Sequence, residues 1–100
     1  MRAVWRDHVI AEAPEEDLVR IEGNWYFPPA SIGEGVLEHS PTAYTCSWKG
    51  DAQYFSVVTP AGRFDDGAWS YPEPIPSSLE RVGTDYSGYV AFSRGVEIAA

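Results

Sequence analysis

The sequence predicts a small, mainly β domain, with short strands arranged as a sandwich or a partly open barrel and with one or two short helices. Four Trp, six Tyr and four Phe make up 14% of the 100 residues, and flat rings pack well on a pleated sheet. Nine Gly and eight Pro favour turns over long helices. About eight short apolar runs recur at intervals of about ten residues, as in sandwiches and barrels.

The first quarter of the chain predicts two pairs of strands. We expect two short strands and a turn within residues 3–13. Residues 18–22 form the next strand and residues 25–27 its partner, with Gly23-Asn24 as a two-residue turn. Two apolar runs around such a pair of residues are typical of a tight hairpin.

The best helical candidate is the segment Ser31–His39. Its apolar residues have helical spacing, although two glycines weaken the pattern. We therefore expect a short helix or a 3₁₀ turn that ends before Ser40-Pro41.

The segment 42–55 holds the only cysteine, Cys46, and the only lysine, Lys49. It predicts a hairpin that turns at Gly50-Asp51 and returns along residues 52–59. Large rings alternate onto both faces of the return strand, which indicates a strand covered on both sides.

The last third predicts shorter elements. Residues 68–71 form a strand, and the prolines within residues 71–76 keep the chain extended. Residues 77–82 form one helical turn, and residues 89–92 and 96–98 form a closing hairpin.

Length and charge limit the possible functions. One hundred residues form a single domain, 1–100. The net charge is −8 and the arginines are scattered, which argues against a nucleic-acid polymer as partner. A mononucleotide, which needs only one or two positive groups, stays open.

One cysteine forms no internal disulfide, so we expect a cytoplasmic protein. No run of 18 apolar residues and no signal-peptide core is present, so we expect no membrane span.

Three residues are candidates for catalysis. Lys49 could hold an anionic ligand, although lysines at hairpin tips are often only solvated. Cys46 could be a nucleophile with His8, His39 or Lys49 as its partner, although a free cysteine is commonly a small buried hydrophobe. Glu22 could act as a general base or bind a ligand donor, although it could equally be a solvated strand end.

Four aromatic residues could wall a pocket, and their hydroxyl or indole groups could bind a ligand: Tyr26, Tyr54, Trp69 and Tyr71. In a small β domain such rings more often form the core. Asp65-Asp66 could hold a divalent cation, but two acids before a glycine are typical of a turn. There is no phosphate-binding loop, useful carboxylate pair or Ser/His/Asp arrangement, and we expect no metal and no cofactor.

The chain resembles the family of unknown function DUF427 over nearly its whole length. The resemblance lies in the run 45–55, with its Cys-x-x-Lys-Gly core, and in residues 68–74. Glu22, Tyr26-Phe27-Pro28 and the closing residues 88–92 also match.

This resemblance implies a β-tent fold, in which two antiparallel sheets meet at an angle with a pocket between them. Some relatives of that fold hold a structural zinc with two cysteine pairs, which this chain lacks. The family also carries a nucleotidyltransferase label, although the sequence shows no metal site of that kind. If the family motif marks a pocket, its positions here are Glu22, Tyr26, Cys46, Lys49, Tyr54, Trp69 and Tyr71.

We therefore expect a small soluble domain that binds a small anionic ligand, nucleotide-like or another metabolite, in a pocket between two sheets. Whether it is an enzyme or a binding module without turnover stays open, as do its ligand, pathway and oligomeric state. The alternative is a non-catalytic structural or protein-interaction domain whose aromatic residues form the core.

Overall fold

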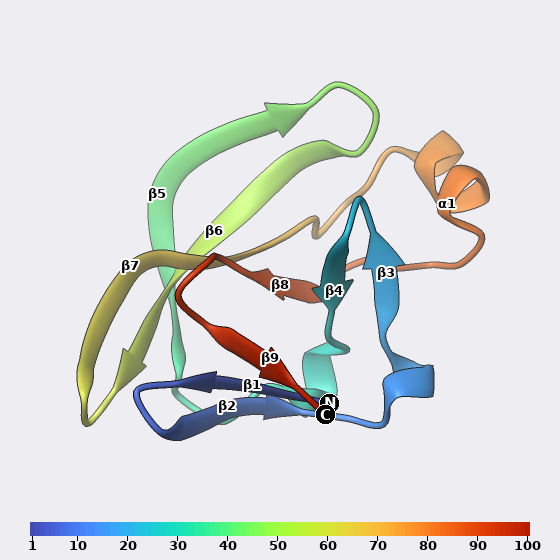
Figure 1. The fold of residues 1–100 in the computed structure, drawn as a ribbon. Helices are drawn as coiled ribbons and strands as arrows, with labels where there is room; N and C mark the ends of the chain where they lie inside the picture. The colour runs from blue at the N-terminus through green and yellow to red at the C-terminus, as the bar shows by residue number, and fades with distance from the viewer.

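A computed structural model describes all residues 1–100 and shows a mainly β fold (Figure 1). Hydrogen-bonded neighbours within the three sheets are antiparallel, with strand orders β2-β1-β9, β3-β4 and β5-β6-β7-β8. The prediction of a mainly β domain with short helices is confirmed. The elements are β1 (Arg2–Trp5), β2 (His8–Glu12), β3 (Val19–Ile21), β4 (Asn24–Tyr26), β5 (Leu37–Cys46), β6 (Gly50–Thr59), β7 (Gly62–Ser70), α1 (Pro76–Val82), β8 (Val90–Phe92) and β9 (Glu97–Ala99), with 3₁₀ turns at Glu15–Asp17 and Pro29–Ser31.

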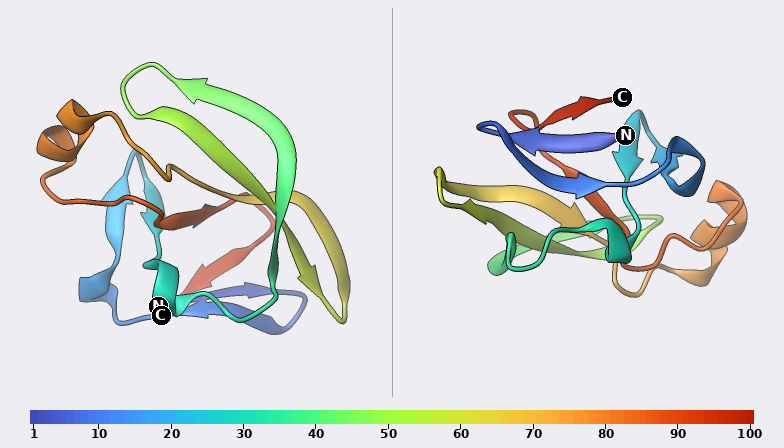
Figure 2. Two further views of the ribbon diagram at one scale, coloured as in Figure 1. Left: turned by 180° about the vertical axis from the view of Figure 1, so that it is seen from behind. Right: turned by 90° about the horizontal axis from the view of Figure 1, so that it is seen from below.

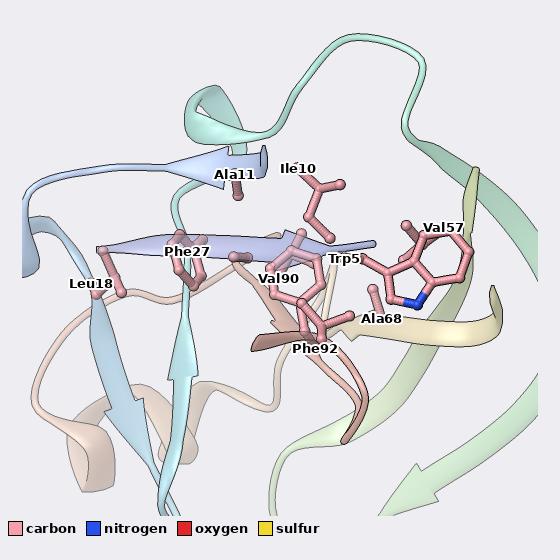
Figure 3. Close-up of a cluster of buried hydrophobic side chains, with 11 residues drawn as sticks. Trp5, Ile10, Ala11, Leu18, Phe27, Val57, Ala68, Val90 and Phe92 are labelled. Carbon is pink, nitrogen blue, oxygen red and sulfur yellow. The ribbon is translucent and has the colours of Figure 1, made fainter. Parts of the chain in front are cut away.

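The main core lies between the three-stranded sheet and the four-stranded sheet, which form two layers in the right-hand view of Figure 2. The two chain ends lie side by side, because β1 pairs with β9. Figure 3 shows how the core side chains converge from both layers. We call this set the central core: Ala3, Trp5, Ile10, Ala11, Leu18, Phe27, Val57, Ala68, Val90, Phe92 and Val96.

A second buried cluster lies on the opposite face of β4 and β8. Side chains alternate along a strand, so Phe27 packs in the central core while Tyr26 packs in the second cluster. In β8, Ala91 likewise faces away from Val90 and Phe92. Leu79 and Val82 of α1 pack on this second set, which we call the tyrosine cluster: Ile21, Tyr26, Tyr71, Tyr86 and Ala91.

The β3–β4 turn is displaced by one residue from the prediction. Asn24 belongs to β4 and pairs with Ile21, so the turn consists of Glu22 and Gly23. Their φ angles of 53° and 83° match a type I′ turn, which suits the twist of a tight hairpin. Just beyond this hairpin, Phe27 and Val90 exchange backbone hydrogen bonds of 2.7 and 2.9 Å, which attach it to β8.

The β5–β6 turn also differs from the prediction. Gly50 and Asp51 are part of β6, where Gly50 pairs with Cys46, and the turn is formed by residues 47–49. Gly50 has a φ of 107°, and a Cβ there would lie 3.4 Å from a side-chain carbon of Ile75. The positive φ favours glycine at this position, and the turn packs against residues 73–75.

The predicted helix over residues 31–39 is wrong in its main part. A 3₁₀ turn occupies Pro29–Ser31, and β5 already begins at Leu37. The intervening chain pairs with β2 instead, since the Gly33 N–H donates to the Ile10 carbonyl at 2.8 Å. Gly35 adopts a φ of 74°, which a helix does not allow.

Two predictions for the last third also require correction. Residues 65–67 were expected to form a turn before a strand over residues 68–71, but they lie within β7, where Asp66 has a φ of 55° and the pairing with β6 shifts register. The runs around residues 90–92 and 97–99 do not form a hairpin, because β8 pairs with β7 and β9 pairs with β1. The helical turn before them is confirmed as α1. No helix in the structure is long and apolar enough to cross a membrane.

Candidate functional site

Lys49 is buried, although it lies at the tip of a hairpin. Only 5% of the residue is exposed. The Ile75 N–H donates to the Lys49 carbonyl at 2.9 Å, which folds the 47–49 turn onto the chain that leads to α1. The ammonium lies 4.9 Å from the ring centre of Tyr71 and 5.2 Å from that of Trp48. Sequence reasoning expected a solvated lysine as the alternative to a site, and the structure excludes that alternative.

Glu22 supplies the only carboxylate that pairs with Lys49. Lys49 Nζ donates to Glu22 Oε1 at 2.5 Å, and 56% of the Glu22 side chain is exposed. The pair therefore joins a buried ammonium to a solvated carboxylate across two hairpin tips, both on the α1 side of the molecule (Figures 1 and 2). We call Lys49, Glu22 and the Trp48 and Tyr71 rings next to the ammonium the Lys49 site.

The surroundings of Lys49 keep it charged at neutral pH. Burial by itself lowers the pKa of Lys49, but the hydrogen bond to the Glu22 carboxylate and the negative charge of that carboxylate raise it, and the pKa lies above its ordinary value. A charged ammonium binds and orients anions, whereas a nucleophile or a base requires the neutral amine. A charged ammonium at this position can therefore hold an anion.

Tyr26 adds a buried hydroxyl beside this ammonium. The residue is fully buried, and Trp69 Nε1 donates to its hydroxyl oxygen at 3.0 Å. Burial raises the pKa of Tyr26, while the Trp69 hydrogen bond and the Lys49 charge lower it in part. The phenol is neutral at physiological pH, and the structure pairs its hydroxyl hydrogen with no acceptor. It can therefore donate to an oxygen placed near Lys49.

The Tyr71 ring packs against the ammonium of Lys49. Burial raises the pKa of Tyr71 to about 12, against the opposing effect of Lys49. Its ring packs edge-on against Tyr86 at 6.4 Å. The Tyr86 hydroxyl donates to Ser78 Oγ at 2.8 Å, and Ser78 Oγ donates to the Ile75 carbonyl at 2.7 Å. This chain of hydrogen bonds attaches the start of α1 to the site.

Cys46 and Tyr54 lie at the margin of this arrangement. Cys46 is half-buried, packs against the tyrosine cluster and makes no hydrogen bond. His39 packs edge-on against Phe55, with ring centres 5.1 Å apart, and His8 lies in β2, so neither imidazole activates the thiol. The ring of Tyr54 lies 6.3 Å from that of Trp69, but no hydrogen bond or ring contact joins Tyr54 to Lys49.

The expected aromatic-walled pocket is not an open cavity. The structure has four surface hollows, and none is lined by Lys49, Glu22 or the four aromatic candidates. Trp69 and Tyr71 instead pack with Tyr26 and Tyr86. One of these hollows has a volume of about 220 Å³, and the residues that line it are close in sequence to Lys49 and Tyr71. They are Asp51, Ala52, Gln53, Pro72 and Glu73.

The structure places no metal ligands together. No group of three or more His, Cys, Asp and Glu side chains could hold an ion. The two acids considered for a cation point to different partners: Asp65 accepts from Arg63 at 2.8 Å, and Asp66 accepts from Thr42 Oγ1 at 2.7 Å.

Two neighbours of Lys49 were not among the predicted site residues. Trp48 shares the 47–49 turn and lies against the ammonium, a position that only its adjacency to Lys49 could have indicated. Arg81 of α1 places its guanidinium carbon 4.3 Å from the Trp48 ring centre. No signal in the sequence links Arg81 to a turn more than thirty residues earlier.

Comparison with known proteins assigns the chain to a family. A family model described as "Domain of unknown function (DUF427)" matches residues 1–99. No curated protein matches the chain. Glu22, Tyr26, Lys49, Trp69 and Tyr71, which carry the family resemblance, are brought together by the fold. The chain belongs to the DUF427 family.

Proposed function

We propose that the Lys49 site binds the anionic group of a small molecule, and that Glu22 occupies the anion position in the free protein. One observation carries the proposal: a buried ammonium whose only carboxylate partner is more than half exposed and comes from another hairpin. Burying a lysine is costly unless it is paired. A partner that is itself solvated is one that a ligand oxygen can replace.

The exposure of Glu22 supports its displacement. More than half of its side chain is exposed, so the carboxylate can turn toward water while the hairpin keeps its shape. Because Lys49 is buried, its ammonium requires an oxygen partner, and a ligand oxygen would supply that partner when the Glu22 carboxylate turns to water. A ligand carboxylate or phosphate would then accept from the ammonium and from the unused Tyr26 hydroxyl hydrogen. Hydrogen bonds to charged groups contribute about 1.5–3 kcal/mol each.

The alternative is a structural role, in which the ion pair only fastens two hairpin tips. It is favoured by one observation, that no hollow in the structure is lined by Lys49. Under this alternative the domain acts through interactions with other proteins, and no small anion binds at the site. The two functions therefore differ in what happens when the Glu22 carboxylate is removed.

A thermal-shift screen of nucleotides, phosphorylated metabolites and small carboxylates tests the proposal. It is run on the wild type, on Glu22→Gln, which keeps the shape but removes the competing charge, and on Lys49→Met. A ligand at 100 times its dissociation constant stabilises the native state by about 2.7 kcal/mol, which raises the midpoint by roughly 10 °C or more in a domain of this size. We expect the same compounds to stabilise the wild type and, more strongly, Glu22→Gln.

Lys49→Met should lose these shifts while keeping the native far-ultraviolet circular dichroism. Arg2→Gln, which breaks an exposed ion pair on β1, is the matched control and should respond as the wild type does. If no compound stabilises Glu22→Gln, or if Lys49→Met keeps the shifts, the structural alternative is correct.

A further inference from the structure

Arg81 is a second positive group beside the Lys49 site. It lies in the last turn of α1, is exposed, and makes no hydrogen bond or ion pair. Arg6, Arg20 and Arg94 also have no carboxylate partner, and Arg6 and Arg20 lie over Trp rings as Arg81 does. Arg81 differs from them because the ring that it lies over, Trp48, also lies against the buried ammonium of Lys49.

The two cations share one aromatic ring. Lys49 Nζ lies 5.2 Å and Arg81 Cζ lies 4.3 Å from the ring centre of Trp48. The two groups are therefore no farther apart than the sum of these distances, and the long arginine side chain can close the remaining gap on a shared oxyanion. The electron-rich ring attracts each of the two cations, but it neutralises neither.

Rigid elements hold both groups in place. The 47–49 turn is fixed to the chain before α1 by the Ile75 N–H to Lys49 carbonyl bond. The first turn of α1 is fixed by the Tyr86–Ser78 hydrogen bond. Lys49 and Arg81 thus come from two segments that are bonded to each other, which is a requirement for two charges that act on one ligand.

We propose that Lys49 and Arg81 together bind the phosphate group of a small phosphate monoester, with the Trp48 ring as the apolar surface between them. This inference rests on the proposed function and specifies its ligand class. In the free protein Glu22 supplies one negative charge for Lys49 and none for Arg81. A phosphate monoester carries about two charges at neutral pH. Its three oxygens suit an ammonium and a guanidinium fork at once, whereas a carboxylate supplies one charge.

A purely structural explanation of Arg81 is the competing one. A cation in the last turn of a helix is favoured by the helix dipole, and stacking on Trp48 adds a contact. This explanation requires no ligand and predicts that removing Arg81 affects only the stability of α1. The two explanations are separated by a pair of probes that share a phenyl ring and differ mainly in the charge of their anionic group.

Phenyl phosphate and benzenesulfonate are such a pair, because at pH 8 they carry two charges and one charge on the same ring. Binding is followed by nuclear magnetic resonance through the indole N–H signal of Trp48. The variants are Arg81→Gln, Lys49→Met and, as the control, Arg94→Gln, which removes another exposed arginine without an ion pair from the turn before β9. Because Arg81 is exposed, Arg81→Gln should fold normally.

We expect the wild type to bind phenyl phosphate at least tenfold more tightly than benzenesulfonate. Arg81→Gln should lose about tenfold in affinity for phenyl phosphate, which corresponds to about 1.4 kcal/mol, and should no longer prefer it. Lys49→Met should lose both probes, and Arg94→Gln should match the wild type.

Two results would overturn the phosphate assignment separately from the anion site. If Arg81→Gln keeps the full preference, Arg81 has only a structural role and the Lys49 site stands. If wild type and Glu22→Gln bind both probes equally, the site takes anions without selecting phosphate. If Glu22→Gln binds neither phenyl phosphate nor any anion of the screen, the phosphate assignment falls together with the proposed function.

Discussion

The central core and the tyrosine cluster lie on opposite faces of the same two strands, and they differ in chemistry. The central core is built from apolar side chains alone, whereas three of the five residues of the tyrosine cluster carry a hydroxyl. Every buried side-chain nitrogen and oxygen in the protein nevertheless has a hydrogen-bond partner. The apolar face stabilises the fold, and the polar face positions groups beside Lys49.

The division is clearest at two consecutive residues. Phe27 packs edge-on against Phe92 at 5.6 Å in the central core. Tyr26 points the other way, where its hydroxyl accepts from Trp69. Because adjacent side chains of a strand face opposite sides, one short segment connects the fold to the site. Substitutions at these two positions should therefore have different kinds of effect.

The largest effect is expected from Phe27→Ala. Removing a fully buried ring leaves a cavity and should cost about 3–5 kcal/mol of unfolding free energy, measured by urea denaturation. Val9→Ala is the control, since Val9 is exposed and its truncation should change stability by less than about 0.5 kcal/mol. A cost below that of the tyrosine variants would contradict the assignment of the central core as the main source of stability.

Tyr26→Phe should have a smaller effect on stability. It keeps the ring and leaves the Trp69 indole N–H without its acceptor, which should cost about 1–3 kcal/mol. Tyr44→Phe is the control, because the Tyr44 ring is exposed and its hydroxyl makes no hydrogen bond. If Tyr26 also donates to a bound anion, Tyr26→Phe should weaken binding of phenyl phosphate beyond its effect on the fold. Unchanged affinity would remove Tyr26 from the ligand contacts.

These two neighbours also show what the sequence could predict. The aromatic content and the recurring short apolar runs correctly predicted a β domain. The family motif includes Glu22 and Lys49, which the fold brings together as an ion pair. The burial of Lys49 could not be predicted, because it depends on the Ile75 N–H reaching the Lys49 carbonyl from a distant segment. Arg81 was missed for the same reason.

The wrong predictions have a common physical cause. The β8 and β9 segments were expected to pair because a turn-like Ser93-Arg94-Gly95 separates them, but β7 and β1 offered longer-range partners. The segment 31–39 has helical spacing, yet its chain bonds to β2 and then enters β5. In a domain dominated by antiparallel pairing, long-range partners outweigh local propensity.

High pH should act on the tyrosine cluster. The pKa of Tyr71 is raised to about 12, and the pKa values of Tyr26 and Lys49 are also raised. These folded-state pKa values lie above the unfolded values of about 10. The contribution of the three groups to the free energy of unfolding is therefore complete below about pH 10. It is lost as the pH rises through the folded-state values. Urea midpoints should therefore be flat from pH 7 to about 9.5 and then fall.

Tyrosine absorbance at 295 nm provides the second readout of the same titration. Tyr71→Phe should remove one late-ionising tyrosine from the curve and make the decline in stability shallower. An unchanged curve in this variant would show that Tyr71 does not ionise late.

The smallest effects are expected from two carboxylates that are almost equally exposed but have different partners. Glu12 pairs with Arg2, whose side chain is also exposed, whereas Glu22 pairs with the buried Lys49. Glu12→Gln should change the unfolding free energy by about 0–0.5 kcal/mol, since water and salt screen the pair. Glu22→Gln keeps an oxygen acceptor but leaves a buried charge uncompensated, so it should cost about 1 kcal/mol, less than breaking a fully buried pair. The added anion that binds the site should restore this loss in Glu22→Gln and have no effect on Glu12→Gln. Equal costs in the two variants would mean that burial of the lysine does not strengthen the pair, and the argument for Glu22 as the occupant of an anion site would lose its basis.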